Sequence, residues 1–474
     1  MINNVDLTHK PLLKTQALIA GAWHESAKTF PVTNPANGET LAHVTDCGAD
    51  ETYRAIASAK EAFPAWSGLL AKDRAAILHR WATLILEHIE DLAIILNAEQ
   101  GKPVGEARAE ILGGAAYLEW YAGEAVRVYG DLIPSPFKGA RVLVQKQAVG
   151  VCAMITPWNF PSSMIVRKVG AALAAGCPCI LKPAEETPLS ALALGALAME
   201  AGVPAGVFNI LPTSDPARLG KILCESADVR KLSFTGSTAV GKILYAQCAG
   251  TVKKLSLELG GNAPFIVFED ADLDSAVQGA LASKYRNAGQ TCICANRMYV
   301  QESVYAAFSE KFVAAVKGVQ SQPLINAEAV EKVQALVADA LEGGAVCALG
   351  GTAQGQVVAP TVLTHVHSGM RLAQEEIFGP VAPLFSFKDE ADVIAQANDT
   401  AYGLAAYFYA RDVGRVWRVA EALEYGMVAV NSGALTTEVA PFGGVKESGI
   451  GREGSKYGLE EYVEMKYILM GGVS

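Results

Sequence analysis

A cysteine in a glycine-containing turn offers the clearest chemistry in this chain. Residues 287–292 read Asn-Ala-Gly-Gln-Thr-Cys and lie between a predicted helix and a predicted strand. A loop held by rigid elements can present a thiol as a nucleophile. A single cysteine is more often an inert buried residue, so Cys292 needs support from other parts of the chain.

Six further segments carry residue types that suit a binding or catalytic site, although each alone has a structural explanation. Residues 258–262 (Glu-Leu-Gly-Gly-Asn) end a strand-like run, where a solvated glutamate would be ordinary. Residues 234–238 (Phe-Thr-Gly-Ser-Thr), with Gly241, lead from a strand into a helix whose N–H groups could hold a diphosphate, but the spacing is not the G-x-G-x-x-G fingerprint. The others are residues 157–161 (Pro-Trp-Asn-Phe-Pro), 181–185 (Leu-Lys-Pro-Ala-Glu), 375–380 (Glu-Glu-Ile-Phe-Gly-Pro) and 441–449 (Pro-Phe-Gly-Gly-Val-Lys-Glu-Ser-Gly).

Hydrophobic periodicity predicts the elements that position these segments. Two amphipathic helices are expected at residues 51–66 and 72–97. Strands and helices then alternate: strands 149–155, 177–181, 207–210, 231–234, 265–268 and 297–301, with helices 163–175, 189–201, 217–224, 239–249, 273–285 and 304–316. This order predicts an α/β fold with doubly wound parallel sheets and ligands at the carboxyl ends of the strands. Residues 126–147 and the strand 462–469 fit neither series and are candidate subunit contacts.

Composition excludes several classes of protein. A chain of 474 residues with 51% apolar and 19% charged residues predicts two or three globular domains and excludes a disordered or fibrous protein. The net charge of −10 argues against nucleic-acid or anionic-membrane partners, and no apolar stretch is long enough to span a bilayer. Nine cysteines without framework spacing and a start without a targeting pattern predict a cytoplasmic protein with free thiols.

Taken together and in this order, the seven segments resemble the aldehyde dehydrogenase superfamily from about Ala17 to the C-terminus. The similarity is greatest to its succinate-semialdehyde dehydrogenase branch, on Arg167-Lys168, residues 282–296 and residues 451–458. The resemblance implies a Rossmann-type cofactor domain, an α/β catalytic domain and a small β oligomerisation element in a homodimer or homotetramer. The expected limits are 1–125 and 148–255 for the NAD-binding domain, 126–147 and 455–474 for the oligomerisation hairpin and tail, 256–430 for the catalytic domain and 431–454 for a return segment.

The resemblance also implies a mechanism. The Cys292 thiolate attacks the aldehyde to give a thiohemiacetal, while the Asn159 amide and the Cys292 N–H stabilise the oxyanion. Hydride transfer to the nicotinamide leaves a thioester, and Glu258 activates a water to hydrolyse it. No histidine lies in the seven segments and no ligand cluster has zinc spacing, so we expect neither a histidine base nor a metal.

Similarity also assigns a cofactor site. Lys182 and Glu185 face the adenosine ribose, Ser237 the diphosphate and Glu376 the nicotinamide ribose. A carboxylate at 185 would meet the 2′-phosphate of NADP at ~4–5 Å, a repulsion of roughly 3–4 kcal/mol at an effective dielectric constant of ~20. The sequence therefore predicts a preference for NAD, with NADP possible. The remaining cofactor positions implied by the resemblance are Trp158, Gly236 and Phe378.

The substrate is predicted to be succinate semialdehyde, oxidised to succinate. The branch holds the far carboxylate with two arginines and a hydroxyl, which match Arg167, Arg286 and Thr436 here. Thr436 departs from the usual serine and leaves the chain length open, and both arginines could instead be solvated or paired with surface acids. One alternative is that the same mechanism oxidises glutarate semialdehyde or an aliphatic or aromatic aldehyde. A second is acyl transfer to coenzyme A, against which Glu258 argues because that reaction needs no base for water. A third is that the protein is an inactive relative.

Two local features remain open. Cys294, two residues beyond the nucleophile, is either a partner in a reversible oxidative switch or a small buried side chain. Residues 317–322 and 350–358 are shorter than in the family, and both are expected to be surface loops of the catalytic domain.

Overall fold

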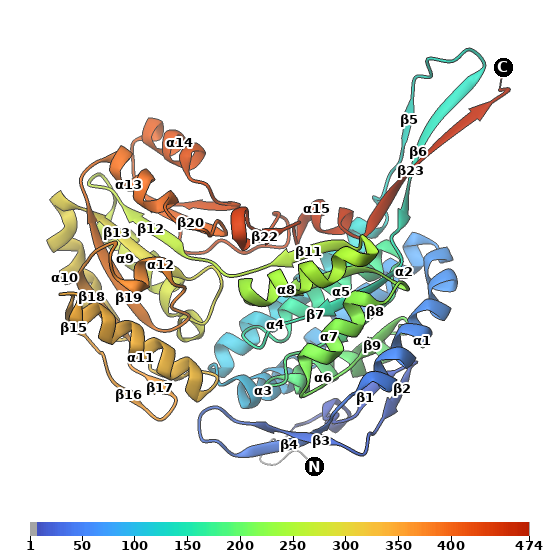
Figure 1. Ribbon diagram of the computed structural model, residues 1–474, viewed down its shortest axis with the longest axis horizontal. Helices are drawn as coiled ribbons and strands as arrows, with labels where there is room; N and C mark the ends of the chain where they lie inside the picture. The colour runs from blue at the N-terminus through green and yellow to red at the C-terminus, as the bar shows by residue number, and fades with distance from the viewer. Residues whose placement is uncertain (1–6, 474) are drawn as a thin grey trace.

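The computed structural model describes residues 7–473, and its largest feature is an eight-stranded sheet (Figure 1). The strand order is β2-β1-β9-β8-β7-β10-β11-β22; the five strands from β9 to β11 are parallel, and the flanking pairs β1–β9 and β11–β22 are antiparallel. The strands are β1 Ala17–Ile19, β2 Ala22–His24, β7 Val151–Ile155, β8 Cys179–Lys182, β9 Phe208–Ile210, β10 Val229–Thr235, β11 Lys254–Glu258 and β22 Gly449–Ile450.

Helices cover both faces of this sheet, as a doubly wound fold requires. In β8 the side chains of Cys179 and Leu181 face one core while Ile180 faces the other, which is the alternation of a strand buried on both sides. One face is covered by α2 Ala71–Glu87, α3 Ile89–Gln100, α4 Val104–Ala125, α5 Ser163–Ala175 and α6 Pro188–Glu200, and the other by α1 Ala49–Gly68, α7 Pro216–Glu225 and α8 Thr238–Cys248.

The prediction of a single helix at residues 72–97 is wrong. The structure has α2 and α3 there, separated by His88, whose φ of −108° and ψ of 22° are not helical. Both helices bury their apolar residues, such as Leu84 and Leu92, in the same core. The apolar pattern therefore continues through the break and gives no sign of it.

A seven-stranded sheet forms the second α/β unit, in the order β15-β18-β19-β13-β12-β20-β21. All pairs are parallel except β15–β18. Its strands are β12 Ala263–Val267, β13 Ala295–Gln301, β15 Val346–Leu349, β18 Thr361–Val366, β19 Val381–Phe387, β20 Ala405–Tyr409 and β21 Met427–Val430. Its helices are α9 Leu273–Tyr285 and α10 Tyr305–Val316 on one face, α11 Ala327–Glu342, α13 Glu390–Asn398 and α14 Val413–Ala422 on the other, and the short α12 Arg371–Gln374.

The chain crosses between the two large sheets at residues 259–262. Because β11 ends at Glu258 and β12 begins at Ala263, the expected boundary after residue 255 falls inside β11 and is three residues early. The chain returns after β21, and β22 pairs with β11. Glu258 therefore lies at the carboxyl end of its strand and beside the second unit, as a ligand-binding edge requires.

A narrow three-stranded sheet projects from the body (Figure 1). It consists of β5 Asp131–Ile133, β6 Ala140–Ala148 and β23 Val463–Gly471, and β6 pairs with β23 from Val463↔Ala148 to Gly471↔Ala140. The hairpin and the tail, distant in sequence, thus form one element. The expected tail of 455–474 begins too early, because α15 Ser455–Glu460 packs on α4 and α5 of the body.

The two shortened segments are not simply surface loops, which corrects that expectation. They pair with each other through β14 Gln322–Pro323, β17 Val357–Val358 and β16 Ala353–Gln354. Leu324, which follows β14, is fully buried. The other elements are the pair β3 Thr29–Thr33 with β4 Thr40–Thr45 and the 3₁₀ turns Lys10–Leu12, Ala249–Thr251, Arg286–Gly289, Glu302–Val304 and Lys446–Ser448.

Within residues 7–473, no helix is both long enough and apolar enough to cross a membrane. Residues 1–6, which begin the expected 1–125 segment and include the N-terminal start, lie outside the described part of the chain. Ser474, the last residue of the expected 455–474 tail, also lies outside it.

Candidate active site

The loop before Cys292 is a left-handed turn. Asn287, Ala288 and Gly289 have φ values of 52°, 54° and 74°, a region that favours glycine and tolerates asparagine. At Gly289 a Cβ atom would lie 2.2 Å from the carbonyl oxygen of Gly379, so a side chain does not fit. The turn joins α9 to β13 and directs the following residues toward the space between the two large sheets.

Cys292 lies on the wall shared by two cavities. One cavity, of about 220 Å³, includes Arg167, Arg286 and Thr436 among its lining residues. The other, of about 260 Å³, is lined by several predicted cofactor residues. The structure therefore brings the predicted thiol between the predicted substrate and cofactor positions. The predicted residues that line the second cavity are Trp158, Asn159, Gly236, Ser237, Glu376 and Phe378.

The predicted oxyanion donor is attached to the cysteine loop. Asn159 is 4% exposed, and its Nδ2 donates a hydrogen bond to the main-chain oxygen of Gln290 at 3.0 Å. An amide nitrogen has two hydrogens, so one N–H remains for another acceptor. Asn159 follows β7 and Gln290 precedes Cys292, so this bond joins the two large units at the site.

Glu258 is a buried carboxyl group without a hydrogen-bond partner. It is 2% exposed, and neither of its oxygens has a partner within residues 7–473. Burial raises its pKa well above the usual value; Glu453 adds to this, while Lys168, Arg452 and Arg167 oppose it. Lys168 is itself buried, and its ammonium group contacts Glu453 and donates to Ser233 Oγ at 3.1 Å. A carboxylate with a raised pKa is a better proton acceptor at neutral pH.

Two carboxyl groups lie near enough to the Cys292 thiol to affect its pKa. Burial raises the pKa of Cys292 to about 12, and Glu376 and Glu258 add to the rise, while Arg167 lowers it. Burial also raises the pKa of Glu376 to about 7, although the N–H of Gly261 donates to its Oε1 at 3.1 Å. The unliganded thiol is therefore protonated at neutral pH and must lose its proton to a base when it reacts.

The second cavity has groups that suit a dinucleotide. Ser237 caps the N-terminus of α8, a position that favours a phosphate. Thr235 Oγ1, in the same cavity, is buried without a partner among the described residues, and Trp158 meets Phe378 edge to face at 5.6 Å. These hydroxyl groups and aromatic walls fit a nicotinamide dinucleotide. No group of three or more metal-ligating side chains is found within the described range.

Lys182 and Glu185 are placed together but outside the lining of that cavity. Lys182 ends β8, and its Nζ lies 2.6 Å from Glu185 Oε2. The carboxylate side chain of Glu185 is 38% exposed, whereas that of Lys182 is 4% exposed. Their place beside the carboxyl ends of β7 and β9 is where an open α/β sheet binds ligands.

The first cavity holds an arginine with free donors. The Arg167 guanidinium lies between the rings of Tyr117 and Phe442, at 4.6 and 4.9 Å, and its Nε and Nη1 are buried with no partner in residues 7–473. Arg286 lies over the Phe160 ring at 4.9 Å. The alternative of a surface ion pair is therefore wrong for Arg167, which is 5% exposed. Unpaired buried donors are costly unless a ligand satisfies them.

Cys294 is a free, buried thiol. It is 3% exposed and its Sγ donates to the Lys284 carbonyl at 3.4 Å. This is the geometry of a small buried side chain, and the oxidative switch stays a prediction.

Sequence reasoning missed the residues that surround these groups. Tyr117 and Phe442 hold Arg167, and Lys102 and Glu110 lie in the wall of the first cavity. A lysine between glycine and proline directly after a helix is the one sequence signal that could have pointed to Lys102.

Comparison with known proteins places the whole chain. The aldehyde dehydrogenase family matches residues 23–468. The chain is 56% identical to the NADP(+) succinate-semialdehyde dehydrogenase of Escherichia coli K12, over 98% of this chain and 99% of the relative. It is 55% identical to a 3-sulfolactaldehyde dehydrogenase of Pseudomonas putida, over 99% of each chain, and 54% identical to a glutarate-semialdehyde dehydrogenase of Pseudomonas aeruginosa, over 99% of this chain and 100% of the relative.

Solved structures agree with this match. An NADP-dependent enzyme of E. coli superposes with a TM-score of 0.97 at 56% identity, covering 98% of this chain and 100% of that one. A betaine aldehyde dehydrogenase of Staphylococcus aureus in complex with NAD⁺ gives a TM-score of 0.95 at 34% identity, covering 98% and 97%. NAD or NADP is thus the cofactor class of this fold.

The charges around the thiol predict how Cys292 is alkylated. Iodoacetamide should modify it ever faster from neutral pH to about pH 10, because its pKa is about 12. Glu376→Gln should accelerate the reaction about three- to tenfold above pH 7, since removing a nearby negative charge lowers the pKa of the thiol. Peptide mass spectrometry measures the rate.

The exposed Cys347 is the internal control and should react at the same rate in both proteins. Unchanged or slower alkylation of Cys292 in Glu376→Gln would contradict this electrostatic account.

Proposed function

Since this chain belongs to the aldehyde dehydrogenase family, we propose that it oxidises succinate semialdehyde to succinate with a nicotinamide dinucleotide. The observation that carries the proposal is the position of Cys292 between two cavities. One cavity presents the unpaired Arg167 donors to an anionic group, and the other presents groups that suit the cofactor. A thiol at this junction can hold an aldehyde within reach of both.

In the first step Cys292 Sγ bonds to the carbonyl carbon of the aldehyde. The thiol proton passes to solvent, which reaches the partly exposed Cys292 side chain through the cavity. The carbonyl oxygen gains negative charge and accepts hydrogen bonds from Asn159 Nδ2 and the Cys292 N–H. One such donor contributes ~10²–10³ to the rate of related reactions.

A nicotinamide dinucleotide held in the second cavity would supply the hydride acceptor for the aldehyde hydrogen, and the acyl group would then remain on Cys292 as a thioester. Glu258 then takes a proton from a water that attacks the thioester carbon, the C–S bond breaks, and the acid leaves. Burial of Glu258 supports this role, because a raised pKa favours proton transfer from water near neutral pH. A general base for water also favours hydrolysis over acyl transfer to coenzyme A.

The cofactor would lie along the carboxyl edge of the eight-stranded sheet. Ser237, with Gly236, would hold the diphosphate, Lys182 and Glu185 the adenosine ribose, and Glu376 the nicotinamide ribose, with Trp158 and Phe378 as walls. We propose that NAD is preferred, because the Glu185 carboxylate meets the ribose hydroxyls of NAD but a phosphate in NADP. The ion pair with Lys182 weakens this repulsion without removing it.

The substrate proposal depends on anion recognition. Arg167 offers buried unpaired N–H groups, Arg286 adds a second positive charge, and Thr436 supplies a hydroxyl in the same cavity. Succinate semialdehyde, glutarate semialdehyde and 3-sulfolactaldehyde, for which relatives at 54–56% identity are named, all carry an anionic group away from the aldehyde. The second candidate is therefore glutarate semialdehyde. A neutral aliphatic or aromatic aldehyde would leave Arg167 unsatisfied.

The assembly is proposed to be a homodimer or homotetramer through the projecting sheet. Apolar side chains on this sheet are exposed, which is typical of an interaction surface. They include Leu132, Ile133, Met465, Tyr467 and Leu469. A cytoplasmic location also remains our proposal.

The mechanism predicts that two variants affect NADH formation differently. Cys292→Ser should abolish NADH formation, and Glu258→Gln should give one rapid burst of NADH per active site followed by slow turnover, because hydride transfer precedes hydrolysis. Stopped-flow absorbance with succinate semialdehyde measures both, with and without coenzyme A. A Glu258→Gln enzyme with normal steady-state turnover, or wild-type release of an acyl-coenzyme A product, would refute the assignment.

Cofactor choice should follow the charge at residue 185. The wild type should favour NAD over NADP in kcat/KM by about tenfold or more, and Glu185→Ser should remove most of that preference by admitting the 2′-phosphate. Glu200→Ser, an exposed change at the end of α6, is the control and should leave the ratio unchanged. A wild-type preference for NADP would overturn the role of Glu185.

Arg167 and Arg286 should favour an aldehyde that carries a carboxylate over a neutral aldehyde. Arg286→Ala and Arg167→Met should lower kcat/KM for succinate semialdehyde by about 10–100-fold, because a hydrogen bond to a charged group contributes ~1.5–3 kcal/mol. Butanal has no far carboxylate and should be affected much less. Equal losses for both substrates would show that the arginines do not bind the carboxylate.

A further inference from the structure

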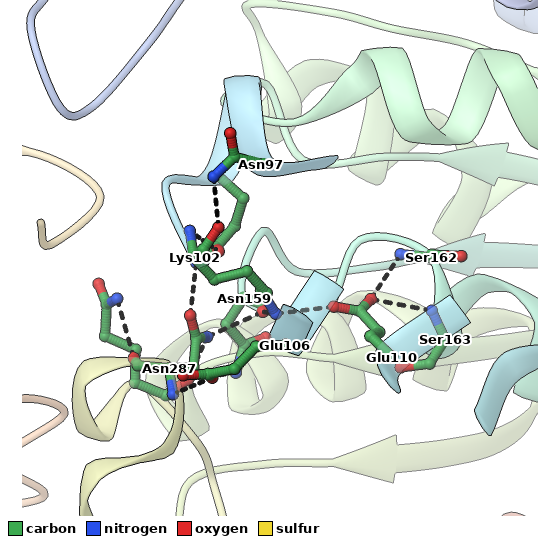
Figure 2. A network of polar contacts seen from close by, with 10 residues as sticks. Asn97, Lys102, Glu106, Glu110, Asn159, Ser162, Ser163 and Asn287 are labelled. Carbon is green, nitrogen blue, oxygen red and sulfur yellow. Dashed lines mark hydrogen bonds and ion pairs between the residues drawn. The ribbon is translucent and has the colours of Figure 1, made fainter. Parts of the chain in front are cut away.

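The main-chain oxygen of Asn159 is held by two buried side chains. Lys102 Nζ donates to it at 2.7 Å and Asn287 Nδ2 at 3.0 Å (Figure 2). We propose that Lys102 and Asn287 are positioning residues that fix the Asn159 amide against the Cys292 loop. This inference rests on the proposed role of Asn159 as the oxyanion donor.

Lys102 is anchored on all sides. It is 1% exposed, donates to Glu110 Oε2 at 2.7 Å, and lies over the Phe160 ring at 3.9 Å. Glu110 in turn accepts the N–H groups of Ser162 and Ser163 at 2.9 and 3.1 Å with its other oxygen. The ammonium group therefore ties the segment after β7 to α4 and to the start of α5, on both sides of Asn159 (Figure 2).

Asn287 holds the other side of the junction. Its Oδ1 accepts from Gln100 Nε2 at 3.0 Å, and its Nδ2 also approaches the Gln290 oxygen at 3.3 Å. Its backbone N–H donates to Glu106 Oε2 at 2.7 Å. Asn159 Nδ2 donates back to the same Gln290 oxygen. The oxyanion donor and the cysteine loop are thus linked in both directions.

The shortened connection supports this arrangement from outside. Gln322 Nε2 donates to Glu106 Oε1 at 2.9 Å, and the Ile325 N–H donates to Gln290 Oε1 at 3.0 Å. Glu106 therefore bridges the connection and the backbone of Asn287. Residues 322–325 do not enter the cavity wall beside Cys292, so their effect passes through the loop.

These contacts bear on rate because the oxyanion donor must be placed accurately. A displacement of ~1 Å in an active-site group can cost about 10²-fold in rate. Asn159 Nδ2 has one bond to Gln290, and its side chain moves with the backbone that Lys102 and Asn287 hold. Loss of either donor would let that backbone shift without removing Cys292, Glu258 or a cofactor residue.

The test is a double-mutant cycle read in kcat. Lys102→Met and Asn287→Gly are each made in the wild type and in Asn159→Ala, and glycine is chosen because it accepts the positive φ of residue 287 without strain. In the wild type each should lower kcat by about 10–100-fold, with little change in KM for the cofactor. In Asn159→Ala each should have less than about a threefold effect, because the donor it positions is absent.

Two further variants keep the test decisive if Lys102→Met folds poorly with Glu110 left unpaired. The double variant Lys102→Met/Glu110→Gln removes both buried charges. Lys102→Arg should restore part of the kcat that Lys102→Met loses. Lys253→Met is the matched control: Lys253 is a buried lysine that donates to the carbonyls of Ser226 and Val229, and its loss should lower the melting temperature without lowering kcat per active site.

Equal fold-losses in both backgrounds, or normal kcat in both single variants, would overturn the inference. If Asn159→Ala itself retained normal kcat, the proposed oxyanion role of Asn159 would fail instead. The two failures are therefore distinguishable.

Discussion

The left-handed turn at residues 287–289 is the constraint on which the site depends. Three successive positive φ angles place Cys292 between the sheets, and such a backbone is held only when its surroundings determine it. Here the surroundings are the Asn287 hydrogen bonds, the close approach of Gly289 to Gly379, and the link from Gln290 to Asn159. The same residues that allow the turn also connect the two large units.

The electrostatics of the site follow from burial. Burial raises the pKa of Cys292 to about 12, that of Glu376 to about 7, and that of Glu258 well above its usual value, and the two carboxyl groups add to the rise at the thiol. For an acid, a raised folded-state pKa means that ionisation opposes folding as pH rises through it. Ionisation of these groups therefore costs stability, and Lys168 and Arg167 oppose that cost at Glu258.

Much of the fold was readable from the sequence because local patterns and tertiary burial agree. The helices predicted at 163–175 and 273–285 coincide with α5 and α9, and the strands at the sheet centres differ by a few residues. The break at His88 could not be predicted from the sequence, because α2 and α3 pack against the same core and the spacing of their apolar residues continues across the break. The pairing of the two shortened segments was also hidden, because strands of two residues carry no periodicity.

The site was predictable to a different extent. Residue type and spacing pointed to Cys292, Glu258 and the segment around Asn159, and the structure brings these regions together. Contacts between residues far apart in the sequence could not be predicted. Nothing in the amino-acid sequence indicates that Lys102 bonds to Asn159 or that Tyr117 and Phe442 pack around Arg167. Such contacts depend on how α4, α5 and the return segment pack, and a single sequence does not specify that packing.

Identity alone does not separate the substrates of this group, because relatives named for three different aldehydes lie within 54–56% of this chain. What their substrates share is an anionic group at a short distance from the aldehyde, and what this chain offers is a buried arginine with two free N–H positions in a cavity of about 220 Å³. Thr436 lines the same cavity as Cys292 and Arg167, so we expect the separation of the Cys292 thiol and the Arg167 guanidinium, rather than overall identity, to set the preferred chain length.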